Sequence, residues 1–334
     1  MGTDFTELVD LAAEKVGGAV LVANDEFFAP KENLLKSGAP IFIEGKYTDL
    51  GKWMDGWETR RRRTPGFDWC IVRLGLPGII RGVVVDTSFF RGNYPEHFSL
   101  EACALEGRPN ADDLQSDAIN WTPLLPQLPL AGDTQNSFAV EGGQRATHLR
   151  LKIYPDGGIA RLRVYGEVLP DWERLQRIGG DVDLAAVENG GRVILCSDMF
   201  FGHRHNLIMP GRAANMSDGW ETKRRRGPGH DWVIIKLGAT GQVHRLEVDT
   251  AWFKGNFPES CSLEATSAAH VPEEQLTDLS LEWKNVLPRT KLQAHTRHFF
   301  EKEILNAGQV SHLRFNIFPD GGVSRLRVYG SLSE

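Results

Sequence analysis

The chain contains one sequence written twice. Residues 55–75, DGWETRRRRTPGFDWCIVRLG, recur at 218–238 as DGWETKRRRGPGHDWVIIKLG, with fifteen of twenty-one positions identical at an offset of 163 (218 − 55). Agreement is closer still between 155–166 and 319–330, where ten of twelve residues are the same. Such long-period self-similarity indicates that one fold is formed twice. The two copies also show which residues both retain.

The copies are as long as whole domains. They match from Gly17 to Gly166 and from Gly190 to Gly330, and a span of about 140–150 residues is the usual size of a domain. The repeats of solenoid proteins are shorter, about 20–50 residues, and do not bury a core alone. We therefore expect two domains, a first repeat at 1–168 and a second at 169–334.

Three segments fall outside the close match. The offset drops from 173 (190 − 17) to 163, so the first copy carries ten extra residues (173 − 163) around 36–54, which we expect to form a longer loop. Residues 4–15 have apolar side chains at helical spacing. So does the segment 167–191, through Trp172, Leu175 and Ile178, and Asp171 can cap this second segment. We expect a short helix in each, the second linking the two domains.

The composition is that of a globular protein. The chain has 334 residues, of which 41% are hydrophobic and 25% charged, with a net charge of -6. This charge argues against a nucleic-acid or membrane-surface partner, despite the arginine runs. The first residues show no basic stretch followed by an apolar run, and no 18-residue apolar span occurs, so we expect neither a signal peptide nor a transmembrane helix. We expect a soluble, cytoplasmic protein.

The duplication also tests the cysteines. None of the four, Cys70, Cys103, Cys196 and Cys261, is matched by a cysteine in the other copy. This excludes a disulfide or a thiolate metal site that both domains share, and we expect free buried thiols.

Within each copy the sequence has the periodicity of β-strands. Short runs rich in Val, Ile, Leu and Phe, such as WVIIKLG at 232–238 and HLRFNIF at 312–318, are bounded by Pro, Gly, Asp and Asn. In SRLRVYG at 324–330 the alternation is strict. The PDGG before it is a turn signal. Several strands without alternating helices predict an all-β fold of two tandem antiparallel β-sandwiches.

The strand motifs together resemble the galactose-binding-domain jelly roll of discoidin-like modules. The motifs DGWETRRRR, VDTxxFxGNxPE and PDGGxxRLRVYG each occur twice, in order, and resemble the allantoicase family over Gly17–Gly166 and Gly190–Gly330. The resemblance implies two tandem allantoicase repeats, each a galactose-binding-domain-like jelly-roll β-sandwich, with short linker helices. It further implies a hydrolase of non-peptide C–N bonds that converts allantoate to (S)-ureidoglycolate and urea in purine breakdown, and an assembly of several identical chains.

The implied reaction can be compared with the residues that both copies retain. Allantoate carries one carboxylate and two ureido arms on a single carbon. Arginine is a suitable partner for the carboxylate, and Glu, Asp or Asn can form hydrogen bonds with the ureido arms. Loss of urea needs an acid for the leaving nitrogen and a base for the incoming water. The shared loops contain residues of each kind.

The basic run supplies the candidate anion site. Like charges in sequence repel, and extended backbone sends alternate side chains to opposite faces. We predict that the substrate carboxylate is bound by alternate members of the run, Arg61 and Arg63 or Arg224 and Arg226. A fully solvated run remains the alternative.

Four further pairs are candidates. Glu58 and Glu221 are the candidate acid/base residues, with a structural ion pair as the alternative. The loops after a predicted strand supply further substrate-binding candidates: Asp86, Asn93, Asp249 and Asn256. His148 and His312 are the only histidines that both copies share. They are candidate catalytic residues, although a hydrogen-bonded structural role is the simpler interpretation.

Several residues have structural or weaker interpretations. Trp69 and Trp232 begin predicted strands and are expected in the core, while Asp55 and Asp218 precede glycine and fit Asx turns. The sequence establishes no cofactor. His203 and His205, present only in the second copy, could bind a divalent metal only with a third ligand.

Three questions stay open at this stage. Each chain could hold two sites, one site between its domains, or one working and one decayed site. The fold would also suit a tandem carbohydrate- or small-ligand-binding protein without catalysis. Hydrolysis of a related ureido acid is the third alternative.

Overall fold

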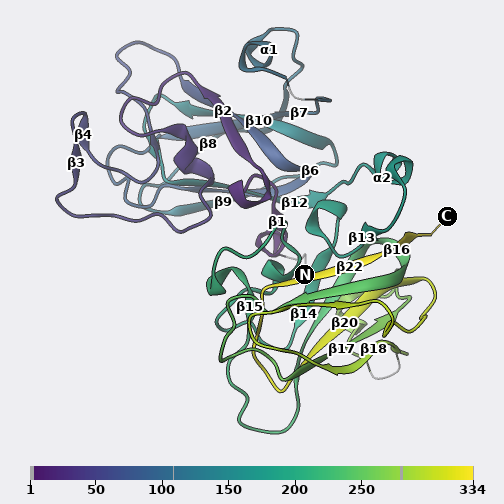
Figure 1. The fold of residues 1–334 in the computed structure, drawn as a ribbon. Coiled ribbons are helices and arrows are strands. Elements are labelled where there is room, and N and C mark those ends of the chain that lie inside the picture. The colour runs from purple at the N-terminus through teal and green to yellow at the C-terminus, as the bar shows by residue number, and fades with distance from the viewer. Residues whose placement is uncertain (1–3, 108, 279–280, 334) are drawn as a thin grey trace. The chain divides into compact units, whose positions relative to one another are not determined.

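The structure is a computed structural model that describes residues 4–107, 109–278 and 281–333. The chain forms two compact units, 1–169 and 170–334 (Figure 1). Each is described by itself below.

The first unit is built around one long strand, β6 (Asp68–Asp86). The strand order is β1-β12-β6-β10-β7-β8, all antiparallel, and β2 and β9 also pair with β6. The bounds of these strands are β1 (Val9–Asp10), β2 (Ala19–Ala23), β7 (His97–Cys103), β8 (Thr122–Pro129), β9 (Gln135–Ala139), β10 (Arg145–Tyr154) and β12 (Arg161–Val168). Alternate residues of β10, from Leu149 to Ile153, are fully buried and form part of the core.

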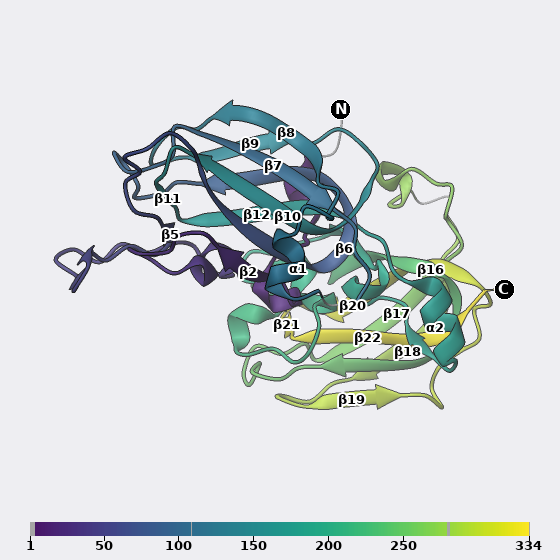
Figure 2. The same ribbon diagram turned by 90° about the horizontal axis from the view of Figure 1, so that it is seen from above.

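Two small pairs of strands complete the first unit. β5 (Trp57–Glu58) pairs with β11 (Gly158–Ile159), and the two lie side by side in Figure 2. The extra residues around 36–54 form a loop that ends in a short hairpin of β3 (Tyr47–Thr48) and β4 (Gly51–Lys52), visible in Figure 1.

The second unit repeats this topology apart from the β3–β4 hairpin. Its order is β13-β22-β16-β20-β17-β18, with β14 and β19 also pairing with β16, and β15 pairing with β21. The bounds are β13 (Val182–Asp183), β14 (Arg192–Cys196), β15 (Trp220–Glu221), β16 (Asp231–Asp249), β17 (Ser260–Thr266), β18 (Lys284–Lys291), β19 (Arg297–Phe300), β20 (Val310–Phe318), β21 (Gly322–Val323) and β22 (Arg325–Leu332). The predicted all-β fold of two β-sandwiches is confirmed.

The helices are short. α2 (Trp172–Ile178) is the predicted linker helix, and the Asp171 side chain caps it by accepting a hydrogen bond from the Arg174 backbone N–H at 2.9 Å. α1 (Ala111–Gln115) lies between β7 and β8. Single turns of 3₁₀-helix make up the rest: η1 (Phe5–Glu7), η2 (Glu14–Val16), η3 (Lys31–Leu35), η4 (Val187–Asn189), η5 (Arg204–Ile208), η6 (Met216–Asp218) and η7 (Glu273–Gln275).

The helix predicted at 4–15 is wrong. This segment forms η1, β1 and η2 instead, because β1 pairs with β12. The Asp10 carboxylate accepts the backbone N–H of Val164 at 3.0 Å, which ties the segment to the sheet. Residues 182–189 form the matching β13 and η4 in the second unit. The copies therefore begin several residues before Gly17, and tertiary pairing outweighs local helical spacing.

The buried tryptophans are not the predicted ones. Trp57 and Trp220 are fully buried, and each indole N–H donates to a backbone carbonyl, of Asp25 and Asp198 respectively, at 2.8 Å. Trp69, by contrast, is only half-buried. It lies opposite Lys152 of β10, on the face away from the core, since opposed residues of an antiparallel pair share a face. Trp232 is also only half-buried, but it packs against a small buried cluster of Ile194, Ile234, Ala268 and Leu276.

All four cysteines are outside disulfide bonds, as predicted, although Cys196 is only half-buried. Burial raises the pKa of Cys103 to about 11 and that of Cys261 to about 12. Among the described residues no helix combines the length and apolar character that a membrane crossing requires.

Candidate active site

Both copies bring their candidate glutamate and asparagine into contact. The Asn93 side-chain amide donates to the Glu58 carboxylate at 2.7 Å, and Asn256 donates to Glu221 in the same way. Because an ionised carboxylate only accepts hydrogen bonds, the amide N–H₂ must face it. The amide oxygen of each asparagine is thereby left to accept a hydrogen bond from another N–H group.

The PDGG loop holds these two residues together. Glu58 pairs with Gly158 across β5 and β11, and the Gly158 backbone N–H donates to the Asn93 carbonyl at 2.8 Å. Its neighbour Gly157 has a φ of +141°, and a Cβ there would lie 2.6 Å from the Pro95 nitrogen. Only glycine fits this approach. The equivalent Gly322 N–H donates to Asn256, also at 2.8 Å.

The basic run divides into paired and unpaired members. In the first copy Arg60 bonds Asp25 at 2.6 Å and Arg62 bonds Asp68 at 2.5 Å. The side chains of Arg61 and Arg63 are exposed and make no ion pair within the described chain. The second copy repeats the alternation: Lys223 and Arg225 pair with Asp198 and Asp231, whereas Arg224 and Arg226 are exposed without a described partner.

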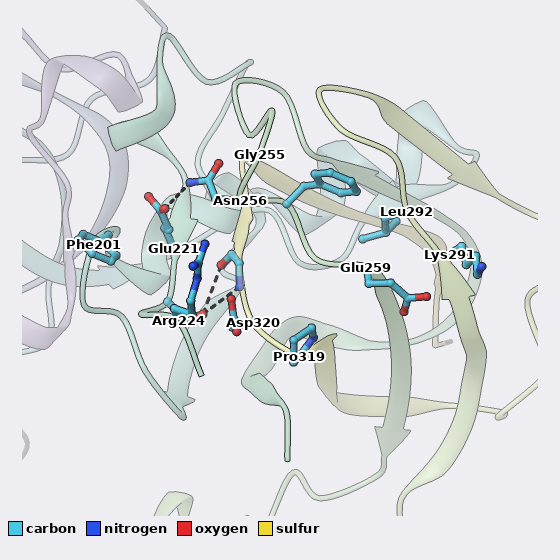
Figure 3. A pocket seen from close by; sticks show the side chains of 13 residues that line it. Phe201, Glu221, Arg224, Gly255, Asn256, Glu259, Lys291, Leu292, Pro319 and Asp320 are labelled. Atoms are coloured by element: carbon cyan, nitrogen blue, oxygen red, sulfur yellow. Dashed lines mark hydrogen bonds between the residues drawn. The ribbon is translucent and has the colours of Figure 1, made fainter. Parts of the chain in front are cut away.

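A pocket of about 640 Å³ in the second unit gathers three of the candidates, Glu221, Arg224 and Asn256. In Figure 3 these three lie toward the same end of the pocket as Phe201, with Lys291 at the far end. Arg226 does not line it. The rest of the lining is formed by Phe201, Thr222, Gly255, Phe257, Glu259, Lys291, Leu292, Pro319, Asp320 and Gly321.

The environment of Glu58 favours proton exchange. Burial raises the pKa of its carboxyl above the ordinary value of 4.5, and the hydrogen bond from Asn93 opposes this shift in part. Asn93 contacts only one carboxylate oxygen. The other oxygen makes no side-chain hydrogen bond within the described chain, so it can take a proton from a ligand or a water molecule.

The two copies differ around this common arrangement. In the first unit the loop at 36–54 reaches Asn93, and Phe42 stacks on Phe89 with 5.7 Å between ring centroids. The result is a separate pocket of about 500 Å³, lined by Phe42, Glu44, Gly45, Tyr47, Lys52, Met54, Phe89, Arg91, Gly92 and Asn93. The second copy lacks this loop. The two sites are therefore unlike in their surroundings.

Comparison with known proteins identifies the family. A model of the allantoicase repeat matches residues 9–169 and 182–333, which correspond to the two units. The chain belongs to the allantoicase family. The first match begins at β1, in agreement with the structure rather than with the sequence alignment that began at Gly17.

The allantoicase family relationship extends over nearly the whole chain. An allantoicase of Dictyostelium discoideum is 51% identical and covers 98% of this chain and 88% of its own. A probable allantoicase of Pseudomonas aeruginosa UCBPP-PA14 is 49% identical over 98% and 97%. The crystal structure of the Saccharomyces cerevisiae allantoicase, 37% identical, matches with a TM-score of 0.79 over 97% of this chain and 93% of that one.

In this allantoicase fold Asp86 and Asp249 are buried turn residues. The Asp86 carboxylate accepts the Ser88 backbone N–H, and the Asp249 carboxylate accepts that of Ala251, both at 2.8 Å. Neither lines the two pockets described above. Their substrate-binding role stays a prediction, while their visible contacts shape the loop that leads to the asparagine.

His148 and His312 lie within the sheets and line neither pocket. Each is 2% exposed, and its Nδ1 bonds a neighbouring hydroxyl, of Thr147 or Ser311, at 2.9 Å. Burial lowers the pKa of both histidines to about 4, with a smaller contribution from nearby cationic side chains. Both are therefore neutral at pH 7. Their catalytic role stays a prediction.

These histidines should make stability fall at acid pH. An unfolded histidine titrates at its ordinary value of 6.5, whereas the folded ones titrate at about 4. The contribution of the two neutral histidines to the free energy of unfolding is therefore complete above pH 6.5 and is lost as the pH falls toward 4. We expect His148→Gln/His312→Gln to lose less unfolding free energy than the parent between pH 7 and 5 in denaturant titrations. An equal fall in unfolding free energy for variant and parent would contradict this prediction. If the variant folds but no longer releases urea, the histidines have a catalytic role instead.

The possible metal ligands of the second copy do not form a site. His205 is buried, its Nε2 lies 3.1 Å from the Val193 carbonyl, and burial lowers its pKa to about 3. The His203 ring nitrogen accepts the His205 backbone N–H at 3.3 Å. Within the described parts of the chain no group of three or more His, Cys, Asp or Glu residues is placed to hold a metal ion.

Sequence reasoning missed several residues of the site. The sequence predicts only a turn at Asp320, yet this residue lines the pocket and its carboxylate accepts the Arg225 backbone N–H at 2.8 Å. Phe201 and Lys291 also line the pocket. Phe201 could have been found from the sequence, because the pair FF occurs in both copies, at 27–28 and 200–201. Lys291 could not have been found by comparing the copies, because the equivalent residue of the first copy is Pro129.

Proposed function

We propose that the Glu–Asn pair of each copy, with the unpaired arginine of the basic run, is where this member of the allantoicase family hydrolyses allantoate to (S)-ureidoglycolate and urea. The observation that carries the proposal is the repetition of this pair in both units, beside a basic run with free members. A carboxylate, an amide and a guanidinium match the groups of the substrate.

The reaction breaks one C–N bond and forms one C–O bond at the central carbon of allantoate. Glu221 takes a proton from water as the water oxygen attacks and passes this proton to the leaving nitrogen, so that urea departs neutral and the carboxylate is regenerated. The free oxygen of the carboxylate is the one available for this exchange. Asn256 holds the other oxygen and presents its own carbonyl oxygen to a ureido N–H. Glu58 and Asn93 take these roles in the first copy.

The substrate carboxylate binds arginine in this proposal. Arg224 lines the pocket of the second copy, is exposed, and makes no ion pair with a carboxylate among the residues that the structure describes. Arg61 is its equivalent. Arg63 and Arg226 are further candidates, since their exposed side chains could turn toward a bound substrate.

The loop at 36–54 exposes apolar side chains, among them Ile41, Tyr47 and Leu50. These side chains support the further proposal that identical chains assemble.

The arginine proposal is tested by charge-matched variants. We expect Arg61→Gln/Arg224→Gln to raise the KM for allantoate by about 10- to 100-fold, the effect of losing a charge-assisted hydrogen bond. Urea release from allantoate is the measurement, with ureidoglycolate as a second substrate to test specificity. Arg60→Gln/Lys223→Gln removes the same charge from side chains that face Asp25 and Asp198, and should change KM far less. Equal effects of the two pairs would refute a specific anion site.

A further inference from the structure

Each copy has a pair of adjacent phenylalanines with at least one exposed ring. Phe200 and Phe201 are 69% and 61% exposed and meet edge to face with 4.8 Å between centroids. Phe27 and Phe28 form the same T-shaped pair at 5.0 Å. Both copies thus pair the two rings in one geometry and leave at least one of them exposed, and exposed apolar rings commonly serve binding.

The two rings of a pair differ in their relation to the site. Phe201 lines the pocket and Phe200 does not. The Phe201 backbone N–H donates to the Glu221 carbonyl at 3.1 Å, and the next residue, Gly202, bridges to Glu221. Figure 3 shows Phe201 at the end of the pocket that holds Glu221 and Arg224. One ring of the pair is therefore fixed beside the carboxylate by the backbone itself.

The first copy repeats this attachment. The Phe28 backbone N–H donates to the Glu58 carbonyl at 3.2 Å. Phe28 is half-buried, and the loop at 36–54 comes close to it: a Cβ at Gly51 would lie 3.7 Å from the ring. Phe27 is 41% exposed and corresponds to Phe200.

A ureido group is planar, and its edges and faces need different partners. Glutamate and asparagine satisfy N–H donors at the edges. The faces carry no hydrogen-bonding groups, and an aromatic ring offers them a flat apolar surface. We propose that Phe201, and Phe28 in the first copy, stack on a ureido arm of the substrate and so determine specificity for ureido acids over simple carboxylates. This inference rests on the proposed function.

The test compares the two rings of each pair by steady-state urea release from allantoate. We expect Phe28→Ala/Phe201→Ala to raise KM by about 3- to 10-fold, the size of one stacking contact, with a smaller change in kcat. Phe27→Ala/Phe200→Ala removes the same apolar area one residue away and should leave KM within about twofold, since neither ring is proposed to contact substrate. Phe28→Tyr/Phe201→Tyr, which retains a flat ring, should restore the parental KM.

The outcomes separate this inference from the proposed function. An unchanged KM in Phe28→Ala/Phe201→Ala would overturn the stacking proposal, as would an equal rise in the Phe27→Ala/Phe200→Ala control. A failure of the tyrosine variant to restore KM would do the same. If stacking fails while Glu58→Gln/Glu221→Gln has lost urea release, the proposed site still stands. If the glutamine variant is fully active, the proposed Glu–Asn site itself fails.

Discussion

Replacing both glutamates, Glu58→Gln/Glu221→Gln, should lower kcat for urea release by about 10²- to 10⁴-fold, the usual contribution of a general acid/base. Glutamine preserves the size of the side chain but cannot take a proton from water. It can still accept the hydrogen bond from Asn93 or Asn256, so the loops should stay in place. Melting curves of the variant should match those of the parent, which separates loss of chemistry from loss of fold.

The single variants report how many sites work. If both copies are active, Glu58→Gln and Glu221→Gln should each retain part of the parental rate, whereas one active copy makes one variant inert and the other parental. Glu259→Gln is the matched control. Glu259 lines the same pocket, but its carboxylate already bonds Arg289 at 3.2 Å. A double variant that folds and releases urea at the parental rate would remove Glu58 and Glu221 from the mechanism.

Duplication explains why much of the fold was predictable. Alternation in 324–330 and the repeated turn motifs depend only on neighbouring residues, and the structure confirms the strands they predict. The alternation of ion-paired and unpaired members in the basic run also follows from local geometry. In extended backbone the side chains of Arg60 and Arg62 point to one face and that of Arg61 to the other. The two copies can be compared position by position to find the residues that both retain. Glu58 and Asn93 are two of these residues, and the structure brings them into contact.

The errors concern contacts between distant parts of the chain. The segment at 4–15 has helical spacing, but its partner in β12 lies about 150 residues away in sequence, and Asp10 contacts Val164 across 154 positions. Trp69 was expected in the core because local sequence does not show which face of β6 packs inward at its start. The proposed role of Phe201 depends on its backbone hydrogen bond to Glu221, which local sequence does not reveal. Such contacts depend on the topology of the sheet, which a single sequence does not specify.

Asp55 shows the same limit and leads to a prediction of its own. It was interpreted as an Asx turn, but its carboxylate bonds the Arg161 guanidinium at 2.5 Å, and both residues are almost fully buried. Burial alone would raise the pKa of Asp55, but the hydrogen bonds from Arg161 and from the Ile41 backbone hold it below its ordinary value. The ion pair ties β12 to the loop that leads into β5 and Glu58.

Asp55→Ala should therefore destabilise the first unit by about 3–5 kcal/mol, since it leaves the Arg161 charge buried without a counter-ion. The loss corresponds to a fall in Tm of about 10 °C for a unit of this size, measurable by calorimetry. Asp218→Ala is the matched control, because the equivalent pair with Arg325 is more exposed: 26% of the Asp218 side chain is accessible, against 6% for Asp55. Water can then compensate part of the arginine charge, so the second unit should lose less stability. Equal losses in the two variants would show that burial does not set the strength of this pair.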